Sequence, residues 1–217
     1  MTNFSPNMLK TYQSCPKKYY YKFVEQITVP MSFLKFEKGK KIHALANYYL
    51  KKVNISRIET ALTEEEQNVW QLLLNNPYFQ KKCYKSEYQL SCKLGKYWVG
   101  GRLDAVVYDD NGYYILDYKT GSVPKNPEYD CQTMIYLLCL NEQLPQVSHL
   151  SFVYIDLKDK RNHVIDFSEK MKNQYEESLL SLCTKITSDN EFLCDTKSCK
   201  FCEYKNICPQ ENDFEMF

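Results

Sequence analysis

Long hydrophobic runs are missing from this sequence of 217 residues, since it contains no stretch of about eighteen consecutive apolar residues. The N-terminus also lacks the basic and then apolar pattern of a secretory signal. From these two absences we expect a soluble, cytoplasmic protein that does not associate with a membrane.

Nucleotide-binding loops and repeats are absent as well. No G-x-x-x-x-G-K-[ST] motif occurs, so an ATPase or helicase activity would belong to a separate chain. We find no internal repeat and no low-complexity linker. We therefore expect one domain spanning residues 1–217, with an N-terminal helical segment (1–30) and a cysteine-rich tail (194–217) as parts of it.

Net charge is almost absent, at +1, but its distribution is uneven. Residues 1–60 carry eleven Lys or Arg against three Asp or Glu, and the rest of the chain is acidic. A basic N-terminal third is suited to attract a polyanion. A solvated, lysine-rich surface would explain the same pattern.

Hydrophobic residues make up 44% of the chain and aromatic residues 15%, which is enough to fill a core. Caps and periodicity predict helices that surround a run of strands, so the fold class is α/β (α+β) with a central mixed β-sheet flanked by helices. Two short helices are predicted near the N-terminus, one beginning at Pro6 after the cap Ser5 and one following Pro16. A third helix spans 36–52, and a fourth runs from the capping box of Thr63 and Glu66 to about 75. Two further helices run from Pro127 to about 140 and from the cap Ser168 to about 186. The predicted strands span 84–93, 96–108, 113–119, 149–157 and 163–167.

Two charged residues, Asp117 and Lys119, interrupt an otherwise apolar strand in GYYILDYKTG. Residues two apart in a strand point to the same face, and burying such charges is costly unless they pair or bind something. The preceding DDNG turn allows two registers. A two-residue type I′ loop sets Asp104 opposite Lys119, whereas a four-residue loop sets Asp104 opposite Asp117. Either loop places Asp104, Asp117 and Lys119 on one face.

Two carboxylates on neighbouring strands repel each other unless a cation lies between them. Asp104 and Asp117 would suit Mg²⁺ or Mn²⁺ and leave positions for water and phosphate. Lys119 could then orient or deprotonate a water, or stabilise negative charge on a phosphoryl oxygen. A structural ion pair between Asp117 and Lys119 is the simpler explanation of the tripeptide taken alone.

Ten cysteines are present, and four of them lie close together near the C-terminus, in CDTKSCKFCEYKNIC. Closely spaced cysteines in a cytoplasmic protein indicate a metal or cluster site rather than disulfides. Cys199, Cys202 and Cys208 are strong candidates for ligands of an iron–sulfur cluster or of zinc. The spacing leaves the fourth ligand open, and Cys194 would complete a local set.

Several motifs, in order, resemble the PD-(D/E)xK nuclease superfamily and its RecB-like, iron–sulfur-containing branch, which includes CRISPR-associated RecB-type exonucleases. The resemblance covers nearly the whole chain and implies a restriction-endonuclease-like core. Its motifs are SPNMLKTYQSCPKKYYYKFVEQI, KGKKIHALANYYL, GGRLDAVVYDDNGYYILDYKTG, QTMIY and CKFCEYKNIC.

The resemblance implies a role for each matching residue. Catalysis would rest on Asp104, Asp117 and Lys119, and the metal would be held by His43, Asp104, Asp117 and the carbonyl of Tyr118. The [4Fe–4S] ligands would be Cys15, Cys199, Cys202 and Cys208, so that the tail clasps the N-terminus. DNA would be contacted by Gln132, Tyr136, Lys17, Lys18 and Arg102. Glu87 is either an acid supporting the site or a surface residue.

The implied function is a Mg²⁺- or Mn²⁺-dependent DNA nuclease, most simply an exonuclease of DNA repair or recombination that acts on single strands or duplex ends. A separate helicase or a CRISPR adaptation protein would be its partner. One alternative is a nuclease that trims prespacers during CRISPR adaptation. Another is a non-catalytic DNA-binding subunit of a helicase–nuclease complex, although such subunits usually lose at least one catalytic residue.

Overall fold

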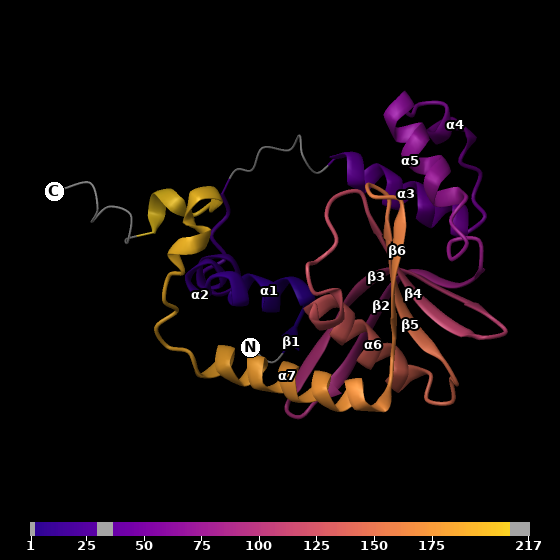
Figure 1. The fold of residues 1–217 in the computed structure, drawn as a ribbon. Helices are drawn as coiled ribbons and strands as arrows, with labels where there is room; N and C mark the ends of the chain where they lie inside the picture. The colour runs from indigo at the N-terminus through magenta and orange to yellow at the C-terminus, as the bar shows by residue number, and fades with distance from the viewer. Residues whose placement is uncertain (1–2, 30–36, 209–217) are drawn as a thin grey trace.

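A mixed sheet of six strands runs through the centre of the protein in the computed structural model, which describes residues 3–29 and 37–208 (Figure 1). The order is β1-β3-β4-β5-β6, and β2 pairs with the other edge of β3. β4 and β5 are parallel, as are β1 and β3, and the remaining pairs are antiparallel. The strands are β1 (Asn3–Phe4), β2 (Lys82–Leu94), β3 (Tyr97–Asp109), β4 (Gly112–Lys119), β5 (Leu150–Asp156) and β6 (Arg161–Asp166). The predicted fold class, a central mixed sheet flanked by helices, is confirmed.

Helices cover the sheet from two sides and enclose two hydrophobic cores (Figure 1). The larger core lies under α1, α6 and α7, and the smaller one under α3 and α5. The described helices are α1 (Pro6–Ser14), α2 (Pro16–Tyr19), α3 (Glu37–Leu50), α4 (Ser56–Glu59), α5 (Glu64–Leu74), α6 (Cys131–Gln143) and α7 (Glu169–Ser188). None of them is long and apolar enough to cross a membrane.

The predicted helix caps are present. The Ser5 side chain accepts a hydrogen bond from the Met8 amide, and Ser168 caps α7 in the same way. Thr63 and Glu66 form the complete capping box of α5. These caps satisfy amide groups that have no partner within the helix.

A helix is present near the predicted range 127–140, but the prediction that it begins at Pro127 is wrong. Residues Pro127–Tyr129 form a 3₁₀ turn, and α6 begins only at Cys131. The reason is Asp130, which has an extended backbone and caps α6 by accepting a hydrogen bond from the Gln132 amide. Asn126, the residue before Pro127, is an equally good N-cap by residue type, but its side chain makes no capping hydrogen bond.

The turn between β3 and β4 decides between the two predicted registers. Asp109 pairs with Gly112, and Ala105 pairs with Leu116, so the next pair along sets Asp104 opposite Asp117. The register that placed Asp104 opposite Lys119 is therefore wrong. The Asp109 carboxylate accepts a hydrogen bond from the Asn111 amide, which favours a turn centred one residue earlier than Asn-Gly alone would predict.

β3 shares one edge between two strands. β1 pairs with it at Trp98 and Val99, whereas β4 pairs with it only from Ala105 onward. Between these points, the hydroxyl of Tyr136 on α6 donates a hydrogen bond of 2.8 Å to the Arg102 carbonyl. The pairing of β3 with β4 therefore ends next to Asp104, and the Tyr136 side chain of α6 occupies the opening between β1 and β4.

Candidate active site

Four ionisable side chains from three elements meet where β3 and β4 part. α3 supplies His43, β3 supplies Asp104, and β4 supplies Asp117 and Lys119. Asp104 joins two of these elements, because its Oδ1 lies 3.0 Å from His43 Nδ1 and its Oδ2 accepts a 3.0 Å hydrogen bond from the Tyr118 amide. The structure thus brings together the residues predicted for catalysis.

His43 is held between two hydrogen-bond acceptors. Its Nδ1 faces the Asp104 carboxylate, and its Nε2 lies 2.9 Å from the Tyr118 carbonyl. Both bonds require the ring to donate, which only the protonated imidazolium can do at both nitrogens. Burial opposes the charged ring, but the hydrogen bond and charge of Asp104, together with the charge of Asp117, raise the pKa of His43 above its ordinary value.

Asp117 is a buried carboxylate with a partner at each oxygen. Gln132 Nε2 donates to its Oδ1, and Lys119 Nζ lies 2.7 Å from its Oδ2. Burial, and then the charge of Asp104, raise the pKa of Asp117 against the opposing effect of Lys119.

The donor set suits a hard divalent cation. It consists of the carboxylates of Asp104 and Asp117, the carbonyl of Tyr118 and an imidazole, and Mg²⁺ and Mn²⁺ accept such ligands. Asp117 faces the Lys119 ammonium, and Asp104 and the Tyr118 carbonyl face the His43 ring, so these oxygens lie where positive charge is stabilised. Within the described part of the chain, no three His, Cys, Asp or Glu side chains are placed so that they could hold a metal ion by themselves. The residue types suit a hard cation whose coordination water and substrate would complete.

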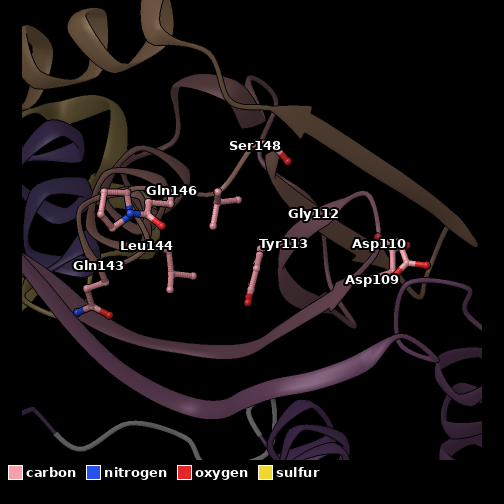
Figure 2. Close-up of a pocket in the computed structure, with 10 residues that line it drawn as sticks. Asp109, Asp110, Gly112, Tyr113, Gln143, Leu144, Gln146 and Ser148 are labelled. Carbon is pink, nitrogen blue, oxygen red and sulfur yellow. The ribbon is translucent and has the colours of Figure 1, made fainter.

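A separate hollow of about 500 Å³ lies at the opposite end of β4 (Figure 2). Gly112 and Tyr113 line it, together with residues 143–148 after α6. Gly112 and Lys119 are seven residues apart on one strand, or about 23 Å. This hollow therefore lies away from the active-site side chains.

Comparison with known proteins agrees with this geometry. A family model described as the PD-(D/E)XK nuclease superfamily matches residues 3–209. The chain belongs to this superfamily. The family assignment makes it a nuclease and confirms the predicted family.

Individual relatives of this nuclease are distant. A protein of Francisella tularensis subsp. novicida (strain U112), named CRISPR-associated exonuclease Cas4, is 22% identical over 206 residues, which cover 93% of this chain and 91% of the relative. A crystal structure of an Eubacterium rectale protein, described provisionally as an exonuclease, superposes with a TM-score of 0.57 at 10% identity and covers 95% of this chain and 88% of that chain. This second likeness supports the fold.

The predicted DNA-contacting residues of the nuclease have different surroundings. Gln132 touches the active site through Asp117, whereas Tyr136 is buried and its hydroxyl is bound to the Arg102 carbonyl. The Arg102 side chain is 66% exposed and pairs with Glu87 at 2.9 Å, so both lie beside the site. Contact of these residues with DNA stays a prediction.

The two predicted N-terminal lysines also have protein partners. Lys18 forms a 2.7 Å ion pair with Glu203, and the ammonium of Lys17 lies over the rings of Tyr20 and Tyr21. Lys18 therefore joins α2 to the cysteine-rich tail. A role of either lysine in DNA binding stays a prediction.

Five thiols gather where the tail meets the N-terminal helices. Cys194 Sγ lies 3.6 Å from Cys199 Sγ and 3.7 Å from Cys208 Sγ. Cys15 Sγ, at the start of α2, accepts a hydrogen bond from the Asp195 amide. Cys202 packs in the same small apolar cluster, with Tyr21 and Tyr204. The residues fit a thiolate-bound group that joins the two ends of the fold, and residues 209–217 of the predicted tail lie outside the described residues.

One neighbour of Lys119 was not predicted. Lys119 Nζ lies 5.6 Å from the ring centroid of Tyr154, which pairs with Asp117 across the parallel strands β4 and β5. The sequence around Tyr154 gives no sign that this residue lies beside Lys119. Only the pairing of β4 with β5, two strands far apart in the sequence, reveals the contact.

Proposed function

We propose that this nuclease hydrolyses phosphodiester bonds of DNA with Mg²⁺ or Mn²⁺, most simply as an exonuclease. The observation that carries the proposal is the convergence of His43, Asp104, Asp117 and Lys119 around the Tyr118 carbonyl. A non-catalytic subunit is disfavoured because all four side chains are present and placed together.

Each residue has a distinct task in the proposed reaction. Asp104, Asp117, His43 and the Tyr118 carbonyl would hold the metal, which supplies Lewis-acid stabilisation of the phosphate and a more acidic water. Lys119, held against Asp117 as an ammonium, would orient the attacking water and stabilise negative charge on a phosphoryl oxygen. Gln132 fixes the rotamer of Asp117 by donating to its Oδ1, the oxygen that does not face Lys119.

The thiols support a proposal for the cofactor and for its effect on the fold. A [4Fe–4S] cluster on Cys15, Cys199, Cys202 and Cys208 would fasten the tail to the N-terminal helices. Such a crosslink stabilises mainly by restricting the unfolded chain. This chain has no ATPase motif of its own, so we propose a separate helicase as its partner if it acts in DNA repair.

Substitutions of the catalytic pair test the proposed chemistry. Asp117→Ala and Lys119→Ala should reduce DNA cleavage at least about a thousandfold, because charge stabilisation and metal roles contribute at that scale. Binding of DNA, measured by fluorescence anisotropy in EDTA, should change little. The assay uses anaerobically purified protein with 5′- and 3′-labelled DNA and Mg²⁺ or Mn²⁺.

Asp104→Asn separates a metal role from a purely structural one. It should raise the metal concentration needed for half-maximal cleavage, and excess Mn²⁺ should restore part of the activity. Wild-type cleavage by this variant at low metal, or by either catalytic variant, would refute the assignment.

A second candidate function is trimming of DNA ends before their insertion into a CRISPR array. It is favoured by the relative in Francisella, whose name places it among CRISPR-associated exonucleases. Affinity purification from the native host distinguishes the two: a CRISPR integrase among the bound proteins favours trimming, and a helicase favours repair.

A further inference from the structure

A groove with a volume of about 1020 Å³ lies between the C-terminal end of α3 and the first half of β2. Residues 49–55 form one wall and residues 79–86 the other. Its lining contains five lysines and a single carboxylate, Glu59, which is engaged by a 2.9 Å hydrogen bond from Trp70 Nε1. The lysines are Lys51, Lys52, Lys81, Lys82 and Lys85. The groove is strongly positive in a protein whose net charge is only +1.

Only Lys81 among the five lysines forms an ion pair with a described residue. Lys81 forms an ion pair with Asp109, and Lys82 lies over the Tyr108 ring. The other three, Lys51, Lys52 and Lys85, are exposed and form no ion pair with a described residue. The Lys85 ammonium lies 5.9 Å from the centroid of the neighbouring Tyr84 ring, so this lysine and this ring are close together in the groove. The three lysines are available for phosphate groups.

Lys52 occupies a position that favours another residue type. Its φ angle is 57°, in the left-handed region, and it directly follows the C-terminal turn of α3. Glycine is the usual residue there because it avoids steric strain. A lysine at this point carries a small conformational cost, and its side chain lines the groove.

Exposed aromatic rings accompany the lysines. Tyr49 is 46% exposed, and one face of its ring stacks on Phe79, with centroids 5.6 Å apart. Tyr84, which precedes Lys85, is 37% exposed. Lysines beside exposed tyrosines form the pattern by which proteins hold single-stranded nucleic acids, because the rings stack on unpaired bases.

The groove adjoins the active site. α3 carries both His43 and Tyr49, about 9 Å apart along the helix axis. Ser86 Oγ donates a 2.8 Å hydrogen bond to the Asn47 side chain and so fastens β2 to α3 between the groove and His43. The next residue of β2, Glu87, pairs with Arg102, two residues from Asp104. A strand that leaves the active site on this side would enter the groove.

We propose that this groove binds a single-stranded segment of the substrate next to the bond that is cut. Its link to cleavage rests on the proposed nuclease function, but the binding itself can be measured without cleavage. Single strands are favoured over duplex because the stacking rings need unpaired bases.

The first test neutralises the unpaired lysines. A Lys51→Gln, Lys52→Gln, Lys85→Gln triple variant is titrated with fluorescein-labelled oligothymidylate in EDTA at several salt concentrations. The slope of log affinity against log salt should fall by about two, since each phosphate contact on a single strand contributes about 0.7. The matched control, Lys93→Gln, Lys96→Gln, Lys170→Gln, removes the same charge outside the groove and should leave the slope unchanged.

The second test concerns stacking. Tyr49→Leu keeps an apolar contact with Phe79 but removes the stacking ring, and it should weaken oligothymidylate binding about tenfold. Tyr49→Phe should bind like the wild type. A blunt duplex should show little effect of either change.

The outcomes separate the groove from the chemistry. Hydrolysis of bis(p-nitrophenyl) phosphate, which is too small to reach the groove, should be the same in the groove variants and the wild type. A wild type that cleaves neither substrate would refute the nuclease proposal but would leave the binding result valid. Equal slopes for the groove and control triples, or an equal loss of duplex binding in Tyr49→Leu, would overturn the proposed single-strand site.

Discussion

At the scale of single residues, the imidazole of His43 holds a proton where the proposed reaction needs a metal. Asp104 and the Tyr118 carbonyl both accept hydrogen bonds from it. A metal bound through a ring nitrogen requires the neutral ring, so the cation and the proton compete. The pKa of His43 is raised above 6.5, the ordinary value for histidine, so the proton still competes with the metal for the ring above pH 6.5.

Metal binding should therefore release a proton. We expect Mn²⁺ affinity to rise with pH until His43 has lost its proton, and we expect proton release per bound metal to fall over the same range. Isothermal titration in two buffers of different ionisation enthalpy measures that release. In His43→Gln the release should largely disappear, and a pH-independent affinity in the wild type would remove His43 from the metal site.

The residues of the site could be predicted because strand parity is local. Any even loop between β3 and β4 places Asp104, Asp117 and Lys119 together, so an error in the turn left the set intact. The approach of His43 to the Tyr118 carbonyl was not derivable from spacing, because it depends on how α3 packs on the sheet. The resemblance to a nuclease family supplied it.

At the scale of elements, two adjacent glycines of β3 allow close contacts on its two edges: Gly101 beside the opening between β1 and β4, and Gly100 beside β2. A Cβ atom on Gly101 would lie 2.9 Å from the Tyr136 hydroxyl. A Cβ atom on Gly100 would lie 2.4 Å from the Leu90 carbonyl of β2. The first clash involves the end of a side chain, whereas the second involves backbone, which cannot move without disturbing the strand pair.

The two glycines should respond differently to alanine. We expect Gly100→Ala to lower the free energy of unfolding by about 3 kcal/mol and Gly101→Ala by about 1 to 2 kcal/mol, as measured by urea denaturation. In a Tyr136→Phe background, which lacks the clashing oxygen, Gly101→Ala should cost less. Additive effects of Gly101→Ala and Tyr136→Phe would show that Tyr136 does not determine the need for this glycine.

Element boundaries were predictable where a cap gave a chemical signal, as at Ser5, Thr63 and Ser168. The start of α6 was missed because two starting signals, Pro127 and Asp130, lie three residues apart. Tertiary contact favours the second: Asp130 also forms a 2.7 Å ion pair with Lys10 of α1. That ion pair joins segments 120 residues apart, so sequence alone did not reveal it.

At the scale of the whole molecule, the thiol cluster joins the beginning and the end of the described chain. If Cys15 is a ligand, Cys15→Ser should lose the cluster, which shows as a loss of brown colour and of about four irons per chain. It should also lower stability by up to about 5 kcal/mol, because the crosslink closes a loop of nearly the whole chain. Cys194→Ser should keep both the iron and the stability.

The position of Cys194 makes this comparison decisive. Its sulfur lies nearest to those of Cys199 and Cys208, so a local site would give the opposite result: Cys194→Ser would be colourless and Cys15→Ser brown. If the wild type is colourless and binds one zinc ion, the thiols form a tetrahedral zinc site and not an iron–sulfur cluster. Iron and zinc analysis of anaerobic protein distinguishes these results.

The junction between the two chain ends also determines when the protein can finish folding on the ribosome. Tyr12 reaches its hydrogen-bond partner Asp189, at 2.6 Å, only after 177 further residues have been added. At about 5–20 residues per second, this takes about 9–35 s. Throughout that time Tyr12 and Tyr19 lack Phe192, on which they pack in the finished fold. Until then the two rings can pack only on each other and on Phe23, so the N-terminal helices complete their aromatic packing only when the last described segment has been made.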